Sequence, residues 1–191
     1  MSLHKLLHRY HGAKLHELQV SQGGVFRRPS LIHTILGSCV SVTFFHPASA
    51  YGGVFHAFLP EAARYEATHL VCQPYRYVDT AIGMICRRFI GFGVPLEEVE
   101  CKVFGGASAL FAETSSMGPQ NVEVALTELN ARRLRVSATH VGGTRGRKLV
   151  FVTHTGEVYV KTLQREQCSL PGPGGGVGGP PRALTGNRRS R

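Results

Sequence analysis

Short apolar runs bounded by turn-forming residues fill much of the first third of the chain. The runs 31–36 and 40–45 flank the pair Gly37-Ser38, and the run 53–59 follows a loop rich in Pro, Ala, Ser and Gly. Each run is rich in β-branched or aromatic residues and stops at turn formers, which is typical of β-strands. We therefore expect three strands here.

A segment farther along, from Val78 to about Ile90, has the apolar spacing of a helix. Asp79 lies in its first turn, and Gly91 and Gly93 follow its last turn, as at many helix ends. Its apolar positions are Val78, Ala81, Ile82, Ile85, Cys86 and Phe89. Because Cys86 lies on this face, we assign it to the core.

A second helical segment begins near Asn121, a residue type that caps helix N-termini well. Arg132 and Arg133 fall at its C-terminal end, where the helix dipole favours cations. The apolar positions on one face are Val122, Ala125, Leu126 and Leu129. We expect a helix between these limits.

Three further runs, 134–138, 148–154 and 157–163, are strand-like. The pair Thr155-Gly156 between the last two predicts a hairpin turn. No internal repeat is visible. The order of strands, helix, strand, helix and strands predicts one mixed α/β domain.

The basic residues gather at the two ends of the chain. Of the formal net charge of +10, residues 1–28 and 171–191 carry +4 each, which leaves +2 for the middle. We expect a basic extension with the first strands at 1–28, the folded domain at 29–168 and a disordered tail at 169–191, because that tail is rich in Gly, Pro and Arg. Nucleic-acid binding is the least favoured hypothesis, and no specific nucleic-acid partner is expected, because no recognition motif accompanies the charge.

The composition also bears on location. The hydrophobic share of 42% is ordinary for a soluble globular protein, and no apolar stretch approaches the roughly 20 residues of a membrane span. Residues 1–20 lack the apolar run of a signal peptide. The five cysteines are odd in number and form no C-x-x-C, which argues against a disulfide framework and a zinc site. We expect a cytoplasmic protein that is not embedded in a membrane.

Cys39 is a candidate nucleophile because small residues precede it. Gly37 and Ser38 leave room for an incoming carbonyl, and free backbone N–H groups at such a turn could bind an oxyanion. A cysteine between two apolar runs is, however, more often a small buried hydrophobe. The sequence around Cys39 by itself therefore leaves both interpretations open.

His56 interrupts an apolar strand, and alternation places it on one face with Val54 and Phe58. A histidine in such a place is more often a hydrogen-bonded structural residue than a base. If the two strands pair, His56 could hold the Cys39 thiolate and then protonate a leaving amine.

Two glycine-rich loops lack any nucleotide-binding pattern. Gly105 and Gly106 follow a strand-like run without the spacing of a phosphate loop, so we interpret them as a close-approach loop that lines a pocket. The loop 142–148 is flexible and basic, and it is either a solvated turn or a surface for an acidic partner.

Four stretches of the chain together resemble one family, the chemoreceptor glutamine deamidases known as CheD. Each stretch is weak alone, but the ordered set is specific and covers roughly residues 30 to 163. The matching residues are Leu36 to Val40; Gly52, Gly53, His56, Leu59 and Pro60; Lys102 to Ala107; and Gly142, Gly143, Arg147, Lys148, Thr155 and Gly156.

The resemblance implies an α/β sandwich related to the toxin-type deamidases. It implies that Cys39 attacks the carboxamide of a receptor glutamine while His56 transfers the protons; ammonia leaves, and water hydrolyses the thioester to glutamate. The family is also linked to hydrolysis of receptor glutamyl methyl esters, which the same acyl-enzyme chemistry would allow.

The expected partners are the cytoplasmic domains of methyl-accepting chemoreceptors and a CheC-type chemotaxis phosphatase. A non-catalytic adaptor that binds the receptor or CheC is the alternative to an enzyme. No metal or organic cofactor is expected. The substrate and oxyanion loop would comprise Gly37, Ser38, Gly105 and Gly106.

The chain departs from the family at one catalytic position. The family has a threonine six positions before the cysteine, where this chain has His33, with Thr34 beside it. Because adjacent strand residues face opposite ways, Thr34 is not expected to replace that threonine without a register change. Two alternatives follow: His33 orients His56 by a hydrogen bond, or the site is less active than that of the family.

Overall fold

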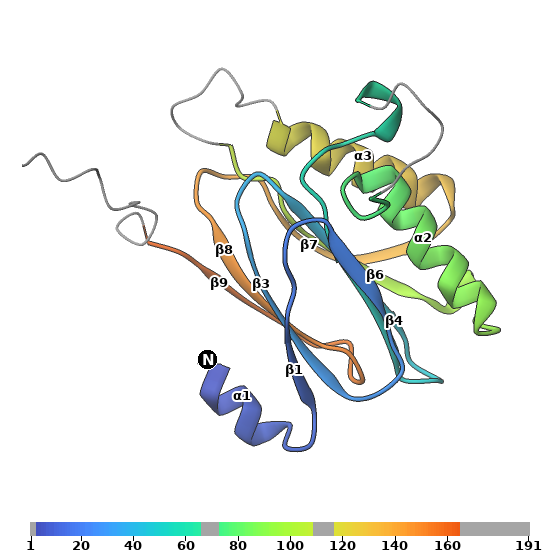
Figure 1. The fold of residues 1–191 in the computed structure, drawn as a ribbon, viewed down its shortest axis with the longest axis vertical. Coiled ribbons are helices and arrows are strands. Elements are labelled where there is room, and N and C mark those ends of the chain that lie inside the picture. Colours follow the sequence, from blue (N-terminus) through green and yellow to red (C-terminus); the bar gives the residue numbers. More distant parts are fainter. Residues whose placement is uncertain (1–2, 66–72, 109–116, 165–191) are drawn as a thin grey trace, which may run out of the picture.

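The computed structural model describes residues 3–65, 73–108 and 117–164, and Figure 1 shows its elements. The helices are α1 (Leu3–Arg9), α2 (Val78–Gly91) and α3 (Met117–Ala131), with 3-10 turns η1 (Ala62–Arg64) and η2 (Leu96–Glu98). The strands are β1 (Lys14–Glu17), β2 (Gln22–Phe26), β3 (Ser30–Leu36), β4 (Val40–His46), β5 (Tyr51–His56), β6 (Glu100–Gly105), β7 (Arg135–Val141), β8 (Arg147–Val152) and β9 (Val158–Thr162).

The strands form two sheets. One has the order β1-β3-β8-β9, and the other has the order β2-β5-β4-β6-β7. In the four-stranded sheet β1 runs parallel to β3, and in the five-stranded sheet β6 runs parallel to β7; the remaining pairs are antiparallel. Segment 1–28 contributes β1 to one sheet and β2 to the other, so it is built into both.

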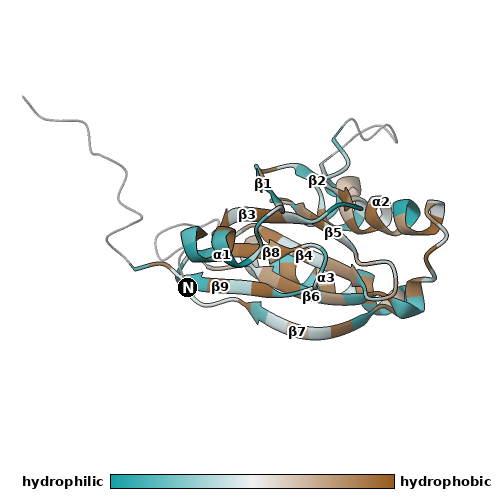
Figure 2. Cartoon of the chain, turned by 90° about the horizontal axis from the view of Figure 1, so that it is seen from below, coloured by the Kyte–Doolittle hydropathy of each residue, from teal (hydrophilic) through white to brown (hydrophobic). Residues whose placement is uncertain are grey.

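Apolar side chains of both sheets meet in the space between them. Ile32 and Leu36 of β3 and Phe151 of β8 pack there against Val54 of β5 and Phe104 of β6. In Figure 2, brown hydrophobic positions recur along the strands in the middle of the molecule. The protein is therefore a two-sheet α/β sandwich, the single-domain mixed α/β fold that we expected.

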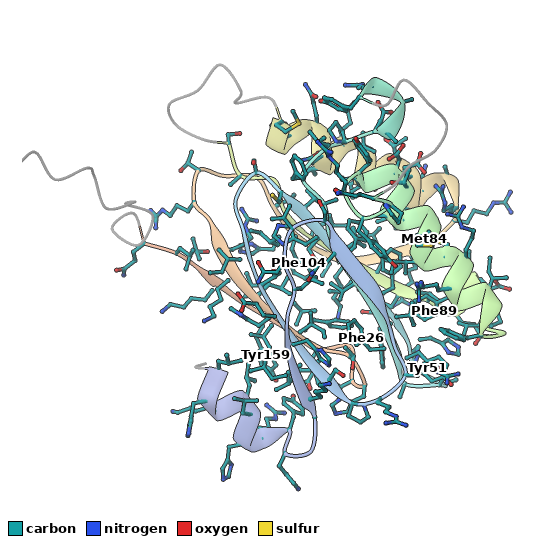
Figure 3. All side chains as sticks on the ribbon, viewed as in Figure 1. Phe26, Tyr51, Met84, Phe89, Phe104 and Tyr159 are labelled. Carbon is teal, nitrogen blue, oxygen red and sulfur yellow. The ribbon has the colours of Figure 1, made fainter. Side chains whose placement is uncertain are left out.

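The helices lie on the outer faces of the sandwich. Helices α2 and α3 pack together on the five-stranded sheet, while α1 lies on the opposite side of the molecule (Figure 1). Phe89 of α2 belongs to the cluster under α2 and α3, and Leu6 of α1 packs on Leu31 and Val152 of the four-stranded sheet. Figure 3 labels Phe89, Phe104 and Tyr159, which lie in these successive parts of the core.

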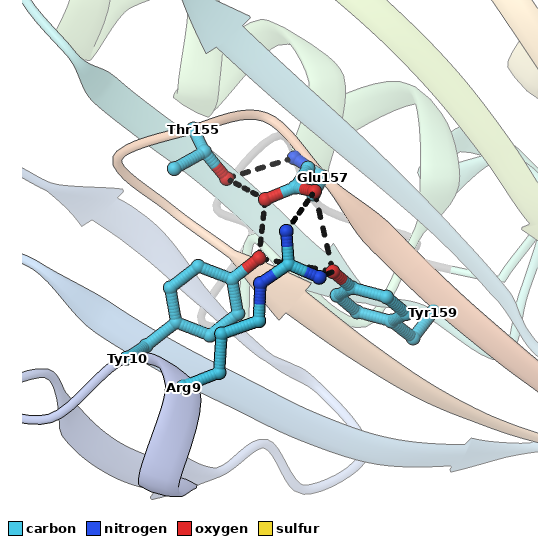
Figure 4. A network of polar contacts seen from close by, with 5 residues as sticks. All are labelled: Arg9, Tyr10, Thr155, Glu157 and Tyr159. Atoms are coloured by element: carbon cyan, nitrogen blue, oxygen red, sulfur yellow. Dashed lines mark hydrogen bonds and ion pairs between the residues drawn. The ribbon is translucent and has the colours of Figure 1, made fainter. Parts of the chain in front are cut away.

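A polar network fastens α1 to the β8–β9 hairpin (Figure 4). The hydroxyl of Tyr10 donates a hydrogen bond to the Glu157 carboxylate and lies 2.9 Å from the hydroxyl of Tyr159. Thr155 and Tyr159 also donate to Glu157, at 3.0 and 3.2 Å, and Arg9 forms an ion pair with it at 3.8 Å. Every acceptor oxygen of Glu157 is thus engaged by a donor or a cation.

The predicted strands and the first helix are confirmed, including the burial of Cys86 in the core. The third strand ends at His56 rather than at residue 59. The second helix begins at Met117, so the expectation that Asn121 caps it is wrong: Asn121 lies inside α3. Helix α1 was not predicted, and the expected tail at 169–191 lies outside the described residues.

Candidate active site

Thr34 and His56 meet in the space between the sheets. Alternation along β3 turns Thr34 to the same side as Ile32 and Leu36, which belong to the inter-sheet core. His56 is the last residue of β5 and shares the inner face with Val54. Thr34 is 2% exposed, His56 is 3% exposed, and the distance from Thr34 Oγ1 to His56 Nδ1 is 2.9 Å.

The hydrogen bonds of Thr34 determine the tautomer of His56. The Thr34 hydroxyl donates its one proton to the carbonyl oxygen of Leu18 at 2.8 Å, so it can only accept from His56. The imidazole therefore carries its proton on Nδ1 and has a lone pair on Nε2. Among the described residues Nε2 has no hydrogen-bond partner. Burial lowers the pKa of His56, so the ring stays neutral and basic at Nε2.

Backbone pairing brings Cys39 beside His56. Val40 and Ala57 exchange two hydrogen bonds of 2.9 Å across β4 and the end of β5. Cys39 and His56 are each one residue from this pair, which makes them diagonal neighbours on one face; such neighbours lie about 7–8 Å apart, within reach of a long side chain. Cys39 also packs against the inter-sheet cluster that contains Val54, so it lies on the side of His56.

The Cys39 thiol is partly buried at the edge of that space, while Gly37 and Ser38 before it are exposed. Burial raises the pKa of the thiol. The free protein therefore holds a neutral thiol beside a neutral imidazole. Such a pair can exchange a proton when a substrate carbonyl arrives, because the imidazole has a free acceptor nitrogen.

The Gly105-Gly106 loop holds the segment that carries Cys39. Gly106 N–H donates to the Cys39 carbonyl at 2.8 Å, and Ala107 N–H donates to the Gly37 carbonyl at 2.9 Å. A Cβ atom at Gly105 would lie 2.1 Å from the Cys39 carbonyl oxygen, so only glycine fits. The Gly106 N–H is therefore engaged in this structure, and the expected oxyanion role of this loop stays a prediction.

A second loop supports the first. Gly142 N–H donates to the Gly105 carbonyl at 2.9 Å, and the buried Arg147 side chain donates to the carbonyls of His140 and Gly142. Arg147 is 3% exposed, so the interpretation of loop 142–148 as a solvated basic turn is wrong for this residue. The stretches that matched in sequence order are therefore joined by hydrogen bonds in space.

The structure does not place His33 against His56, so His33 does not have the orienting role that we expected. His33 lies on the outer face of β3, opposite Val150 of β8, and the partner of His56 Nδ1 is Thr34. Both faces of β3 are apolar, so alternation alone did not say which face meets His56. The residues 37–39 between β3 and β4 are not in strand geometry, and counting back from Cys39 through them loses the register.

Among the described residues, no group of three or more His, Cys, Asp or Glu side chains is placed to hold a metal ion. None of the helices described here is both long and apolar enough to cross a membrane. What the site offers is one thiol, one oriented imidazole and a hydroxyl that fixes the imidazole.

The fold and the site define a class of protein: a two-sheet α/β sandwich in which a threonine orients a buried histidine beside a partly buried cysteine. The chain matches the family model described as "CheD chemotactic sensory transduction" over residues 58–162. This range begins after Cys39 and His56, but the relatives cover more of the chain.

A relative from Nitratidesulfovibrio vulgaris, named "Probable chemoreceptor glutamine deamidase CheD", is 40% identical over 81% of this chain and 80% of its own length. A relative from Geobacter sulfurreducens, "Probable chemoreceptor glutamine deamidase CheD 2", is 42% identical over 74% of this chain and 85% of its own. A relative from Thermococcus kodakarensis, also named "Probable chemoreceptor glutamine deamidase CheD", is 36% identical over 77% of this chain and 93% of its own length. The chain belongs to the CheD family.

Proposed function

We propose that this chain deamidates glutamine side chains of methyl-accepting chemoreceptors, with Cys39 as nucleophile, His56 as general base and acid, and Thr34 as the residue that orients His56. The observation that carries the proposal is the buried Thr34–His56 hydrogen bond. It leaves the Nε2 lone pair, on the face that Cys39 shares, without a partner in the part of the chain that the structure describes. The relatives' names supply the substrate class.

The reaction begins with transfer of the Cys39 thiol proton to His56 Nε2 as Sγ attacks the carboxamide carbon of the glutamine. The tetrahedral intermediate collapses when the His56 imidazolium gives that proton to the departing nitrogen, so ammonia leaves and a thioester remains. A water molecule, deprotonated by His56, then attacks the thioester. Its collapse returns the proton to Cys39 and releases the glutamate side chain.

Thr34 contributes to both halves of this cycle. Its hydroxyl accepts from Nδ1–H and is itself held by the Leu18 carbonyl, so the ring keeps one tautomer and one orientation.

The exposed backbone of Gly37 and Ser38, next to Cys39, is the place where we expect the oxyanion to bind. Attack of Cys39 on a glutamyl methyl ester would give the same acyl-enzyme, with methanol instead of ammonia as the leaving group.

The alternative is a non-catalytic adaptor, which the absence of a threonine at position 33 would favour if His56 had no other residue to orient it. That motive weakens because Thr34 gives His56 its hydrogen bond. A CheC-type phosphatase remains a second proposed partner, on the family resemblance. We assign the reaction to the cytoplasm, where the receptor domains lie and where the free Cys39, Cys86 and Cys101 would stay reduced.

The test is ammonia release from a purified chemoreceptor cytoplasmic fragment, with mass spectrometry of its glutamine-containing peptides. We expect the parent to release ammonia and Cys39→Ala and His56→Ala to release none. Cys86→Ala is the matched control, because it removes another buried thiol, outside the site, and should keep activity. Equal ammonia release by Cys39→Ala and the parent would refute the proposal.

A further inference from the structure

Asn121 of α3 is completely buried, yet it makes its hydrogen bonds outside its own helix. Its side-chain NH2 group donates to the carbonyl of Ser38 and to the carbonyl of Phe58, each at 3.1 Å. Its Oδ1 atom has no partner among the described residues. An unpaired buried oxygen costs free energy, so helix packing alone would favour an apolar side chain here.

The two carbonyls that Asn121 binds lie on the two chain segments that carry the proposed catalytic groups. Ser38 directly precedes Cys39, and Phe58 follows His56 by two residues. The backbone pairing of these segments ends at Val40 and Ala57, beyond which the structure records no bridge between them. The Asn121 amide therefore links the two segments beyond the last backbone pair, at Ser38 on one segment and Phe58 on the other.

Close packing holds Asn121 in this position. Near the start of α3, a Cβ atom at Gly118 would lie 2.6 Å from the Ala107 carbonyl oxygen and 2.8 Å from that of Gly106. The helix thus rests directly on the glycine loop, and the same loop donates the Gly106 N–H to the Cys39 carbonyl. Helix α3, the glycine loop and the segment before Cys39 form one connected unit.

We propose that Asn121 is a positioning residue of this enzyme: by tying Ser38 to Phe58 it fixes where Cys39 stands relative to His56. This inference rests on the proposed function, because it needs Cys39 and His56 to react together. Asn121 does not touch the reacting atoms. Its effect is on the distance and direction of thiol attack, to which rates are steeply sensitive.

The first test compares Asn121→Ala and Asn121→Asp with the parent in steady-state deamidation of the receptor fragment. The aspartate keeps the size of the side chain, and once ionised it has no donor. We expect kcat to fall about 100-fold in both variants while KM for the receptor stays unchanged. Asn130→Ala is the matched control, because Asn130 is an exposed asparagine of the same helix, and it should behave like the parent.

A second measurement uses the unmutated chain, so it does not depend on whether a variant folds. In the ¹⁵N-labelled protein, alkylation of Cys39 with iodoacetamide should shift the side-chain NH2 signals of Asn121 and leave those of Asn130 in place. Parent-like kcat in both Asn121 variants, a loss confined to KM, or unmoved Asn121 signals would each overturn the inference.

Cys39→Ala, assayed beside these variants, separates the two proposals. If Cys39→Ala is inactive while the Asn121 variants keep the parent kcat, the positioning role alone fails. If Cys39→Ala is as active as the parent, the thiol mechanism fails and the role of Asn121 fails with it.

Discussion

The Thr34–His56 pair and the Tyr10–Glu157–Tyr159 network both join elements far apart in the sequence, but they differ in what they leave unpaired. In the network on the outer side of the four-stranded sheet, the Glu157 carboxylate accepts hydrogen bonds from Tyr10, Thr155 and Tyr159. The hydrogen bond from Tyr10 is the main reason why the pKa of Glu157 is lowered. Between the sheets, the buried Nε2 atom of His56 has no hydrogen-bond partner within residues 3–65, 73–108 and 117–164.

This difference separates a polar cluster that stabilises structure from one that suits chemistry. The satisfied hydrogen bonds of Glu157, which lie near the surface, hold α1 in place. A buried, unpaired acceptor costs folding free energy, and natural proteins keep few of them. Such an atom beside a thiol is therefore a stronger indication of a reactive site than the number of polar contacts.

Among the changes that test this comparison, Thr34→Val should have the largest effect, because it removes the hydroxyl and keeps the shape of the side chain. Without the Thr34 oxygen, the His56 ring keeps the interaction with the Leu18 backbone but loses the hydroxyl that orients it, and we expect kcat/KM for deamidation to fall about 100-fold. The matched control is His33→Ala on the opposite face of β3, which should stay close to the parent. A larger loss in His33→Ala than in Thr34→Val would restore His33 as the orienting residue.

The pH dependence of kcat/KM should show a smaller effect, a shift of its acid limb in a direction that the structure predicts. His56 must be unprotonated to accept the thiol proton, and burial lowers its pKa, so the acid limb of kcat/KM should lie below pH 6.5, the ordinary value for histidine. Burial raises the pKa of Cys39, so the neutral pair should persist above the ordinary thiol range. An acid limb centred above pH 6.5 would contradict a neutral, buried His56 as the base.

The smallest effect should come from Tyr10→Phe in the satisfied network. The change removes one hydroxyl that bonds to Glu157 and Tyr159, and we expect the free energy of unfolding to fall by about 1 kcal/mol. Deamidation at a temperature well below the unfolding transition should not change. Loss of activity in folded Tyr10→Phe would mean that the two clusters are coupled and that the contrast between them is wrong.

Much of the sandwich followed from local pattern. The runs on either side of Gly37-Ser38, the helix from Val78 and the hairpin at Thr155-Gly156 formed as predicted, because apolar periodicity and turn chemistry act over a few residues. Helix α1 was missed because it has few buried positions; Leu6 is its one buried residue. It stays in place through Leu6 and the Glu157 network, which are contacts with distant parts of the chain.

In the candidate site, too, local pattern indicated some residues and long-range contacts determined the others. The order of motifs pointed to Cys39, His56 and the two glycine loops, since each stretch carries its own chemical signature. Three roles depend on which residues of other elements lie opposite, namely those of Thr34, Arg147 and Asn121. The local sequence pattern does not contain this information. Strand alternation argues against Thr34, and the residue type of Asn121 argues for a helix cap; both arguments use only neighbours in the sequence.

The sequence by itself therefore determined most of the element types and the family, and it supplied Cys39 and His56 as the proposed reactive pair, because these depend on short-range propensity and on residue identity. The tertiary structure decided which face of β3 meets His56, which carbonyl accepts from the Gly106 N–H and which two carbonyls accept from the Asn121 amide. These depend on how two sheets and a helix pack across more than twenty residues of separation, as in the contact from Asn121 to Ser38, which spans 83 positions. Packing of that range selects one partner among several that the sequence permits.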